Sequence, residues 1–176
     1  MYADNIESIT SLLNMVLHDP SMMDKLFLDF SINVTEMFRD PAFFKTLRHD
    51  VLPLFRQLPN IRIWHAGCST GEEAYSMAIM LHEEGIYDRA RIYATDMNSS
   101  VIRQAKLGLF PLKKMKDYTS NYVRADGMND FSQYYTIHGE CAIFNRELSK
   151  NIVFAQHNLV TDGSFNEFHL ILCRNV

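Results

Sequence analysis

The chain has 176 residues, of which 47% are hydrophobic, and a formal net charge of −4. This composition supports a sizeable core and excludes wholesale disorder, and the length fits one domain with an appendage. The mild negative charge gives no reason to expect a nucleic-acid partner. The three cysteines are widely spaced, and we find neither a signal-peptide pattern nor an apolar run of about 18 residues. We therefore expect a reducing, cytoplasmic location without membrane insertion; the oligomeric state stays open.

The first 58 residues predict a mainly helical N-terminal subdomain. Apolar residues recur at helical spacing over 6–17, and a second short amphipathic helix follows over 22–30. Asp40 is a suitable N-cap for a third helix that has Pro41 at its first position. Pro53 is expected to kink or divide this third helix, because proline lacks the N–H that a helix interior uses.

Residues 59–176 predict an α/β domain, because strand and helix patterns now alternate. Four strands are predicted, over 61–67, 91–96, 152–159 and 169–175. Helices are predicted over 70–84 and 99–107, ending at Gly85 and Gly108. This order is typical of a parallel, doubly wound sheet with right-handed crossovers. The alternation stops over 112–150, where two short runs predict an inserted antiparallel β subdomain. Since no covering segment follows the last strand, we expect a piece of a longer protein.

The segment HAGCSTGEEAYS, residues 65–76, joins the first predicted strand to the helix that follows. Gly67 and Gly71 allow close approach of the backbone to a ligand, but their spacing is not the G-x-G-x-x-G of dinucleotide binders. Glu72 and Glu73 at the helix start would repel a phosphate and attract a ligand with ammonium and sulfonium charges, such as S-adenosylmethionine. Thr70 with Glu73 also matches a capping box, so a purely structural role for these acids stays open.

Polar residues also follow the other predicted strands, at the carboxyl edge where open parallel sheets bind ligands. Asp96 ends the second strand, where an acid accepts hydrogen bonds from a ribose diol; the alternative is an N-cap or loop acid for the next helix. The third and fourth strands end in Asn158-Leu159 and Arg174-Asn175. These four segments are predicted to converge on one site.

A metal site is not predicted. His65 and Cys68 have an H-x-x-C spacing, but a structural zinc ion needs four ligands and no second pair accompanies them.

Six stretches of the sequence resemble the chemotaxis-receptor glutamate methyltransferases of the CheR type, which depend on S-adenosylmethionine. They are, in chain order, NVTEMFRDP, STGEEAYS, IYATDMN, AKLGLF, IVFAQHNL and LCRNV. The resemblance covers the chain from about residue 25 to its last residue. It implies a Rossmann-like S-adenosylmethionine-binding sheet, a helical N-terminal part and an inserted three-stranded antiparallel subdomain.

The resemblance also implies which residues contact the cofactor. They are Asn33, Thr35, Arg39, Glu73, Asp96, Asn158, Leu159, Arg174 and Asn175. Gly67 is a further candidate, because it lies in the glycine turn. Arg39 matches the family arginine beside the methyl-transfer site and is the catalytic candidate. The chain has Ala74 where the family has proline after the paired acids. The family also has a longer N-terminal part, and it continues past LCRNV into residues that supply a tyrosine near the methyl group. This sequence is therefore expected to be truncated at both ends.

The implied function is methylation of glutamate carboxylates on the cytoplasmic helical bundle of a chemotaxis receptor, giving glutamyl methyl esters and S-adenosylhomocysteine. A non-catalytic module that binds S-adenosylmethionine or the receptor is the alternative. A dinucleotide-dependent oxidoreductase is disfavoured by the glycine spacing and the paired acids. A local basic run is either a docking surface for an acidic receptor or an ordinary solvated face; it comprises Arg103, Lys106, Lys113, Lys114 and Lys116.

Overall fold

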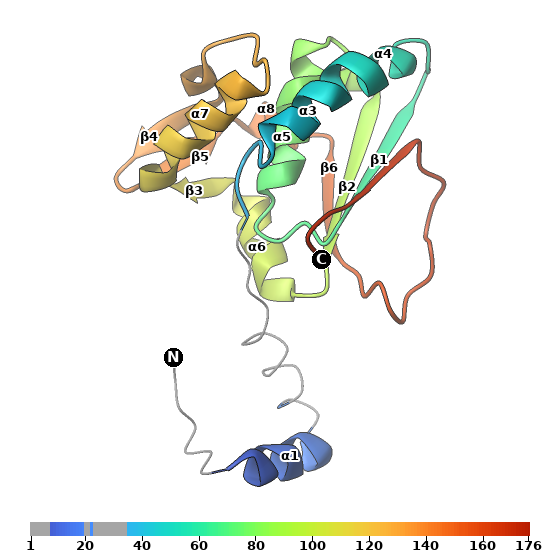
Figure 1. Ribbon diagram of the computed structural model, residues 1–176, viewed down its shortest axis with the longest axis vertical. Coiled ribbons are helices and arrows are strands. Elements are labelled where there is room, and N and C mark those ends of the chain that lie inside the picture. The colour runs from blue at the N-terminus through green and yellow to red at the C-terminus, as the bar shows by residue number, and fades with distance from the viewer. Residues whose placement is uncertain (1–7, 20–21, 23–34) are drawn as a thin grey trace. The chain divides into compact units, whose positions relative to one another are not determined.

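The computed structural model describes residues 8–19, 22 and 35–176 (Figure 1). The chain divides into two compact units, residues 1–33 and 34–176. In the first unit, helix α1 (Ile9–His18) confirms the helix predicted over 6–17, and the Ser8 Oγ caps it by accepting the Ser11 N–H at 3.1 Å. The helix predicted over 22–30 lies outside the described residues, apart from Met22.

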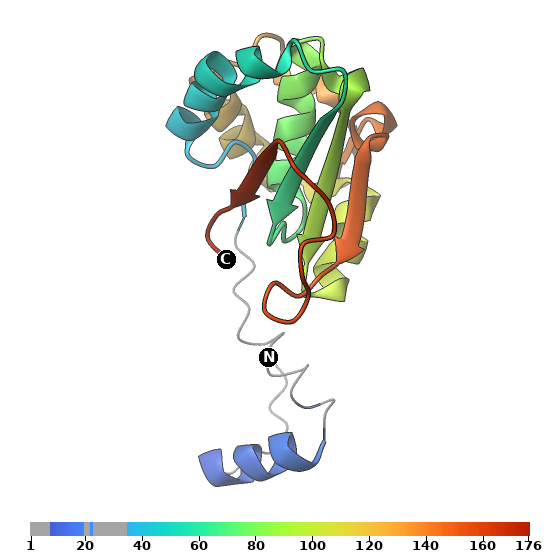
Figure 2. The same cartoon turned by 90° about the vertical axis from the view of Figure 1, so that its right-hand side faces the viewer.

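A parallel four-stranded sheet forms the centre of the second unit. Its strands, in spatial order, are β6 (Ile152–Gln156), β2 (Ala90–Asp96), β1 (Ile61–Ala66) and β7 (Leu170–Cys173). All neighbouring pairs are parallel, as predicted, and Figure 2 shows the strands side by side. The chain proceeds from β1 through β2 to β6, then returns to the other side of β1 with β7. This reversal creates a topological switch point between β1 and β7, where sheets of this class bind ligands.

The two predicted crossover helices are present as α5 (Glu72–Glu83) and α6 (Ser99–Leu107). Both stop where the sequence predicts, because Gly85 and Gly108 adopt φ values of 67° and 62°, a left-handed conformation that glycine tolerates best. The helix α5 begins two residues later than predicted, since the turn before it extends through Gly71.

A separate antiparallel sheet lies around the stretch 112–150, where an inserted β subdomain is predicted, and its first strand precedes that stretch. Its strands, in spatial order, are β3 (Leu109–Pro111), β5 (Cys141–Phe144) and β4 (Tyr135–His138). The helix α7 (Met115–Arg124) was not predicted, although Met115, Tyr118 and Tyr122 recur at helical spacing and are buried. The short helix α8 (Arg146–Ser149) replaces the end of the second predicted run.

Helix α5 lies between the two sheets (Figure 1), and Tyr75 contacts both. The Tyr75 ring centroid lies 6.1 Å from that of Phe154 on β6, and 5.5 and 5.9 Å from those of Phe110 and Phe144 in the second sheet. Burial raises the pKa of Tyr75 to about 12, so the hydroxyl stays neutral in this apolar contact.

The helices that precede the sheet are α3 (Pro41–Thr46) and α4 (Leu52–Phe55), separated by a π-helical turn at 47–51. This confirms that Pro53 divides the helix, because it has no N–H to continue the regular hydrogen-bond ladder. The predicted helix start is confirmed, since Asp40 is the N-cap residue of α3 and Pro41 is its first residue, but the Asp40 side chain does not cap the helix. Asp40 precedes Pro41 but has φ 58° and makes no side-chain cap hydrogen bond, because its carboxylate pairs with Arg174 instead.

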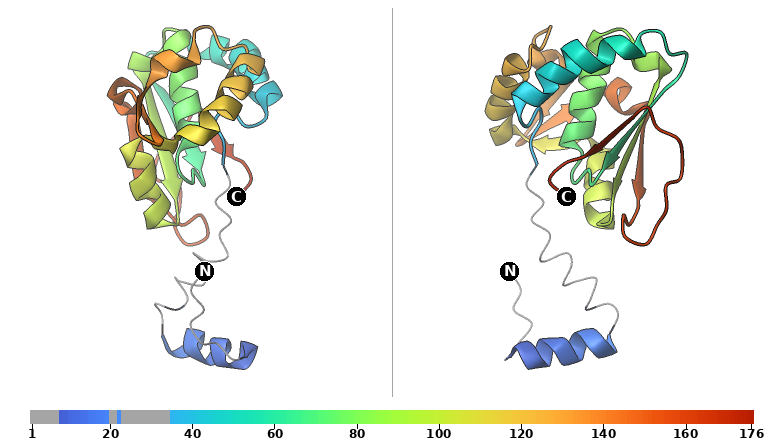
Figure 3. Two further views of the ribbon diagram at one scale, coloured as in Figure 1. Left: turned by 90° about the vertical axis from the view of Figure 1, so that its left-hand side faces the viewer. Right: turned by 45° about the vertical axis from the view of Figure 1, so that its right-hand side comes forward.

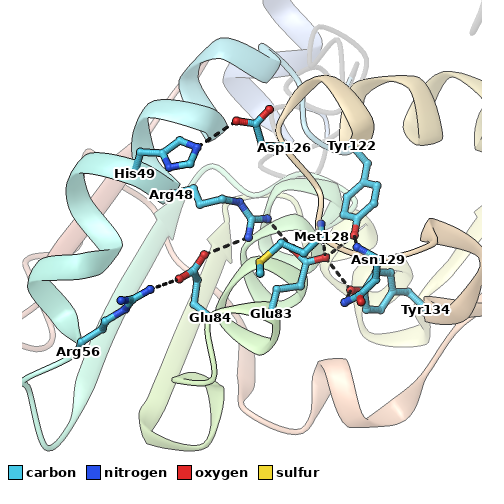
Figure 4. A network of polar contacts seen from close by, with 10 residues as sticks. All are labelled: Arg48, His49, Arg56, Glu83, Glu84, Tyr122, Asp126, Met128, Asn129 and Tyr134. Carbon is cyan, nitrogen blue, oxygen red and sulfur yellow. Dashed lines mark hydrogen bonds and ion pairs between the residues drawn. The ribbon is translucent and has the colours of Figure 1, made fainter.

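A buried ion-pair network joins these leading helices to α5 and to the insertion (Figure 4). The Arg48 side chain is 3% exposed and donates to Glu83 at 2.5 Å and to Glu84 at 3.1 Å. The second oxygen of Glu83 accepts from the hydroxyls of Tyr122 and Tyr134. One carboxylate therefore holds three segments of the chain together.

The segment 157–169 between β6 and β7 contains no helix and returns across the sheet face opposite α5 (Figure 3). Its aromatic residues Phe165 and Phe168 both contact the ring of Trp64 on β1, with centroid distances of 5.2 Å. Among the residues that the structure describes, no helix is long and apolar enough to cross a membrane.

Candidate functional site

The turn between β1 and α5 uses its backbone donors within the protein. The N–H groups of Gly67 and Cys68 both donate to the Thr95 carbonyl oxygen at 2.8 Å. The N–H of Ser69 donates to Asp96 Oδ2, also at 2.8 Å. A phosphate cradle needs such groups to point at the ligand. The geometry therefore agrees with the glycine spacing: this turn is not a phosphate site.

Both glycines of the turn hold positions that other residues fit poorly. Gly71 is the N-cap of α5 with φ 94°, and an added Cβ would lie 3.0 Å from the Cβ of Ala105 on α6. Gly67 has φ 77°, and an added Cβ would lie 2.5 Å from Cγ2 of Val176. These contacts bring the turn against α6 on one side and against the segment after β7 on the other.

The predicted capping box of Thr70 and Glu73 is absent, and no side chain caps α5. Thr70 Oγ1 instead donates to Glu72 Oε2 at 2.6 Å, and the Tyr118 hydroxyl donates to Glu72 Oε1 at 3.1 Å. Burial raises the pKa of Glu72, and these hydrogen bonds offset only part of that increase. Glu72 therefore links the turn to α7 of the insertion.

Glu73 points to other partners. Its Oε1 lies 2.8 Å from His65 Nδ1 on β1, and its Oε2 accepts from Arg174 Nη1 at 3.1 Å. Burial on its own raises the pKa of Glu73, but His65 and then Arg174 outweigh burial, and the net pKa is lowered. An ionised carboxylate is thus held at the switch point between β1 and β7.

Arg174 is held on three sides. Besides Glu73, it donates to the Asp40 carboxylate, and its guanidinium carbon lies 4.0 Å from the centroid of the Phe43 ring. Its side chain is 19% exposed. Arg174 therefore connects the residues after β7 to the start of α3.

Arg39 lies next to this contact in sequence and is half-buried. Its neighbour Phe38 donates its N–H to the Ser76 Oγ of α5 at 2.9 Å. Because Phe38 and Asp40 are both anchored near the start of α5, the Arg39 backbone is placed at the same edge of the sheet.

Asp96 supports the turn from the end of β2. Its two carboxylate oxygens accept the N–H groups of Ser69 at 2.8 Å and of Asn98 at 2.9 Å. Asp96 is not the N-cap of α6, because Asn98 caps that helix by accepting the Ser100 N–H at 2.9 Å, but its two backbone contacts agree with the alternative role of a loop acid. The N–H of His157 donates to the Asp96 carbonyl oxygen, which places the residues after β6 beside it.

The remaining predicted residues make other contacts. Asn158 closes its own turn, its Oδ1 accepting the Val160 N–H at 2.9 Å. The Thr35 carbonyl oxygen accepts from Lys114 Nζ at 3.4 Å. Leu159 and Asn175 are exposed. Asn33 lies outside the described residues. Direct hydrogen bonds thus join Glu73 to Arg174, and Asp96 to the turn.

Three residues that contact Glu73 or Arg174 were not predicted from the sequence to belong to the site. They are His65, Asp40 and Phe43. For His65 a signal existed, because it alternates with Ile61 and Ile63 and therefore faces α5 from β1. No local pattern indicates that Asp40 and Phe43 meet an arginine that follows them by more than a hundred residues.

A hollow of about 290 Å³ lies elsewhere, with Glu83, Tyr134 and Leu148 among its lining residues. Its buried charged group, Glu83, already accepts hydrogen bonds from Arg48 and from two tyrosines. We therefore place the candidate site at the carboxyl edge of the parallel sheet.

The donors and acceptors of that edge fit a ligand with a positive charge and a diol. Glu73 is ionised, and each oxygen of Glu73 and Asp96 keeps a lone pair beyond the contacts it already makes. S-adenosylmethionine carries ammonium and sulfonium charges and a ribose diol, so these two acids suit it.

Comparison with known proteins agrees with this chemistry. Residues 33–176 match the family model described as "CheR methyltransferase, SAM binding domain". The chain is 47% identical over 169 residues to "Putative methyltransferase Cher3" of Pseudomonas putida. The matched region is 96% of the chain and 62% of that relative. It is 30% identical over 160 residues to a "Chemotaxis protein methyltransferase" of Listeria innocua, covering 90% of the chain and 58% of the relative.

A "Chemotaxis protein methyltransferase" of Salmonella typhimurium is 29% identical over 149 residues, which is 82% of the chain and 49% of the relative. The chain thus spans about half to three fifths of the length of these curated relatives. With the parallel sheet, the antiparallel insertion and the acids at the switch point, the chain belongs to the CheR family of methyltransferases, in the domain that binds S-adenosyl-L-methionine.

Proposed function

We propose that the chain carries S-adenosylmethionine-dependent methylation of glutamate side chains on chemotaxis receptors, in the cytoplasm. The products are a glutamyl methyl ester and S-adenosylhomocysteine. One observation carries the proposal: the Glu73 carboxylate, whose pKa is lowered by His65 and Arg174, lies at the switch point where a cationic cofactor is favoured. The names of the relatives, which include chemotaxis protein methyltransferases, support it.

The acceptor carboxylate needs no general base. A glutamate with its ordinary pKa is already ionised at neutral pH. S-adenosylmethionine held by Glu73 and Asp96 would supply a methyl group on a positively charged sulfur. The acceptor carboxylate would take that methyl group, S-adenosylhomocysteine would leave with the electron pair of the broken carbon–sulfur bond, and no proton transfer would be needed. The work of the protein is therefore to align the two reactants and to exclude competing charges.

We propose that Glu73 binds the cofactor ammonium and Asp96 the ribose diol, and that Gly67 allows close approach. The other contacts proposed are Asn33, Thr35, Arg39, Asn158, Leu159, Arg174 and Asn175. Because Arg174 already binds Glu73 and Asp40, its part is to hold the Glu73 carboxylate and to close the site from the β7 side.

Arg39 is proposed to orient the acceptor carboxylate, since a guanidinium group binds a carboxylate through two parallel hydrogen bonds. Arg39→Ala is expected to lose methyl transfer while it still binds S-adenosylhomocysteine measurably. Arg39→Lys keeps the charge but lacks the planar pair of donors, so it should restore transfer only in part. Full transfer by Arg39→Ala would remove this role.

The receptor partner is proposed to be an acidic helical bundle that docks on the basic run. Arg103, Lys106, Lys113 and Lys116 are exposed, whereas Lys114 is half-buried against Thr35 and Tyr118. Reversing two charges, Lys106→Glu with Lys113→Glu, is expected to weaken receptor binding, most at low salt. Lys150→Glu is the control for each of the two single reversals, because Lys150 is exposed on a different element. If the affinity for the receptor changes neither with salt nor on charge reversal, the basic run is not the docking surface.

The activity itself is tested with tritiated S-adenosylmethionine and a purified receptor fragment. We expect label on the receptor that base releases as methanol, and calorimetric binding of S-adenosylhomocysteine but not of NAD. Binding of S-adenosylhomocysteine without transfer would favour the non-catalytic module. Binding of NAD instead would overturn the assignment of the cofactor.

A further inference from the structure

His65 is a buried polar group that the proposed chemistry does not use directly. It is 1% exposed at the end of β1, and its Nδ1 lies 2.8 Å from Glu73 Oε1. The other ring nitrogen, Nε2, is buried and has no hydrogen-bond partner among the described residues. Burying a ring with one nitrogen unsatisfied is costly, so an apolar side chain would serve better if packing were the only role.

The geometry around Glu73 shows what the imidazole contributes. One carboxylate oxygen of Glu73 contacts His65 Nδ1, and the other accepts a hydrogen bond from Arg174 Nη1 at 3.1 Å. Contacts to both oxygens fix the plane of the carboxylate. Arg174 is itself held by Asp40 and Phe43, so it forms a stable support on its side. His65 is the corresponding support on the β1 side.

We propose that His65 is a positioning residue, which donates from Nδ1 and holds Glu73 in the orientation that binds the cofactor ammonium. This inference rests on the proposed cofactor role of Glu73. His65 does not touch the cofactor; it acts through Glu73. The Nδ1 atom must carry a proton, because an ionised carboxylate only accepts hydrogen bonds. If the His65 ring is neutral, Nε2 carries no proton and is an acceptor. If the ring is charged, Nε2 carries a proton that has no acceptor among the described residues.

Two substitutions of similar polarity separate positioning from packing. The amide nitrogen of asparagine reaches about the place of imidazole Nδ1, whereas that of glutamine reaches about the place of Nε2. His65→Asn therefore keeps the donor to Glu73, and His65→Gln removes it. His49→Gln is the matched control, since His49 also pairs with a carboxylate, Asp126, but lies exposed on another element.

The readout is the dissociation constant of S-adenosylhomocysteine measured by calorimetry, alongside the thermal unfolding midpoint. We expect His65→Gln to bind about tenfold more weakly, which corresponds to about 1.4 kcal/mol. His65→Asn and His49→Gln should stay within about threefold of the unaltered chain, which is roughly 0.7 kcal/mol. In a Glu73→Gln background, His65→Gln should have little further effect, because the bond it removes is already altered.

Equal affinity of folded His65→Gln and the unaltered chain would overturn the inference, as would equal losses in the asparagine and glutamine variants. Nitrogen-15 NMR of the unaltered chain supplies a second test that needs no folded variant. It should show a protonated Nδ1 at His65, and a neutral ring protonated only at Nε2 would also overturn the inference. Failure of the unaltered chain to bind S-adenosylhomocysteine would instead contradict the proposed function, while the NMR result would still report on the His65–Glu73 bond.

Discussion

Glu72 and Glu73 are adjacent in the chain, yet their carboxylates have opposite pKa shifts. The pKa of Glu72 is raised, because burial outweighs its hydrogen bonds from Thr70 and Tyr118. The pKa of Glu73 is lowered, because His65 and Arg174 outweigh its burial. Successive residues of a helix point about 100° apart, so the two side chains enter different environments. Their contributions to stability should therefore depend on pH in opposite ways.

For Glu73 we expect Glu73→Gln to lower the free energy of unfolding at pH 7, by about 1–3 kcal/mol, since a charged partner of two donors is lost. A carboxyl whose folded pKa is depressed contributes stability above its ordinary pKa of 4.5 and loses it as the pH falls through the folded pKa. The difference between the two proteins should thus shrink on acidification. Urea unfolding at a series of pH values measures it, and a difference that stays constant down to strongly acidic pH would contradict the expectation.

For Glu72 the sign is reversed. Its folded pKa lies above the ordinary 4.5, so the folded state binds more protons in that window and stability falls as the pH rises through it. Glu72→Gln removes this penalty and keeps an acceptor for the Tyr118 hydroxyl. We expect the variant to be at least as stable as the unaltered chain at pH 7, and the unaltered chain to gain relative to it as the pH falls toward 4.5. Clear destabilisation of Glu72→Gln at pH 7 would show that the ionised form is required.

The Arg48 network predicts a large and specific loss of stability. Arg48→Met leaves Glu83, whose side chain is 1% exposed, without its buried cation. We expect the free energy of unfolding to fall by about 3–5 kcal/mol, measured by urea denaturation. Lys45→Met is the matched control, because Lys45 pairs with Asp126 at the exposed surface. Similar losses in both variants would mean that burial does not set the strength of the Arg48 pairs.

Asp96→Asn tests the ribose contact that we propose. The variant keeps one acceptor oxygen, so one of the two backbone N–H groups loses its partner as well. S-adenosylhomocysteine should bind about tenfold more weakly or worse. The 2′-deoxy analogue of S-adenosylhomocysteine separates the two effects, because it lacks a hydroxyl that Asp96 is proposed to bind. If Asp96 contacts the diol, the substitution should cost less affinity for the analogue than for S-adenosylhomocysteine; equal losses would assign Asp96 to the turn alone.

Much of the architecture was predictable from local pattern. The parallel strands, the stops at Gly85 and Gly108 and the break at Pro53 all depend on residues within a few positions of one another. The errors arose where distant partners compete with a local interaction. Asp40 is the N-cap residue of α3 but its carboxylate pairs with Arg174, and Thr70 and Glu73 matched a capping box but bind other groups.

The sequence by itself determined the fold class, the order of the elements and the acidic character of the turn after β1, since periodicity and turn chemistry are local properties. Only the tertiary structure decided which of the two acids faces Arg174 and which faces Tyr118. Glu73 and Arg174 are 101 residues apart, and they meet because β7 returns to the side of β1. That strand order depends on how the whole sheet packs, and hydrophobic periodicity alone does not specify it.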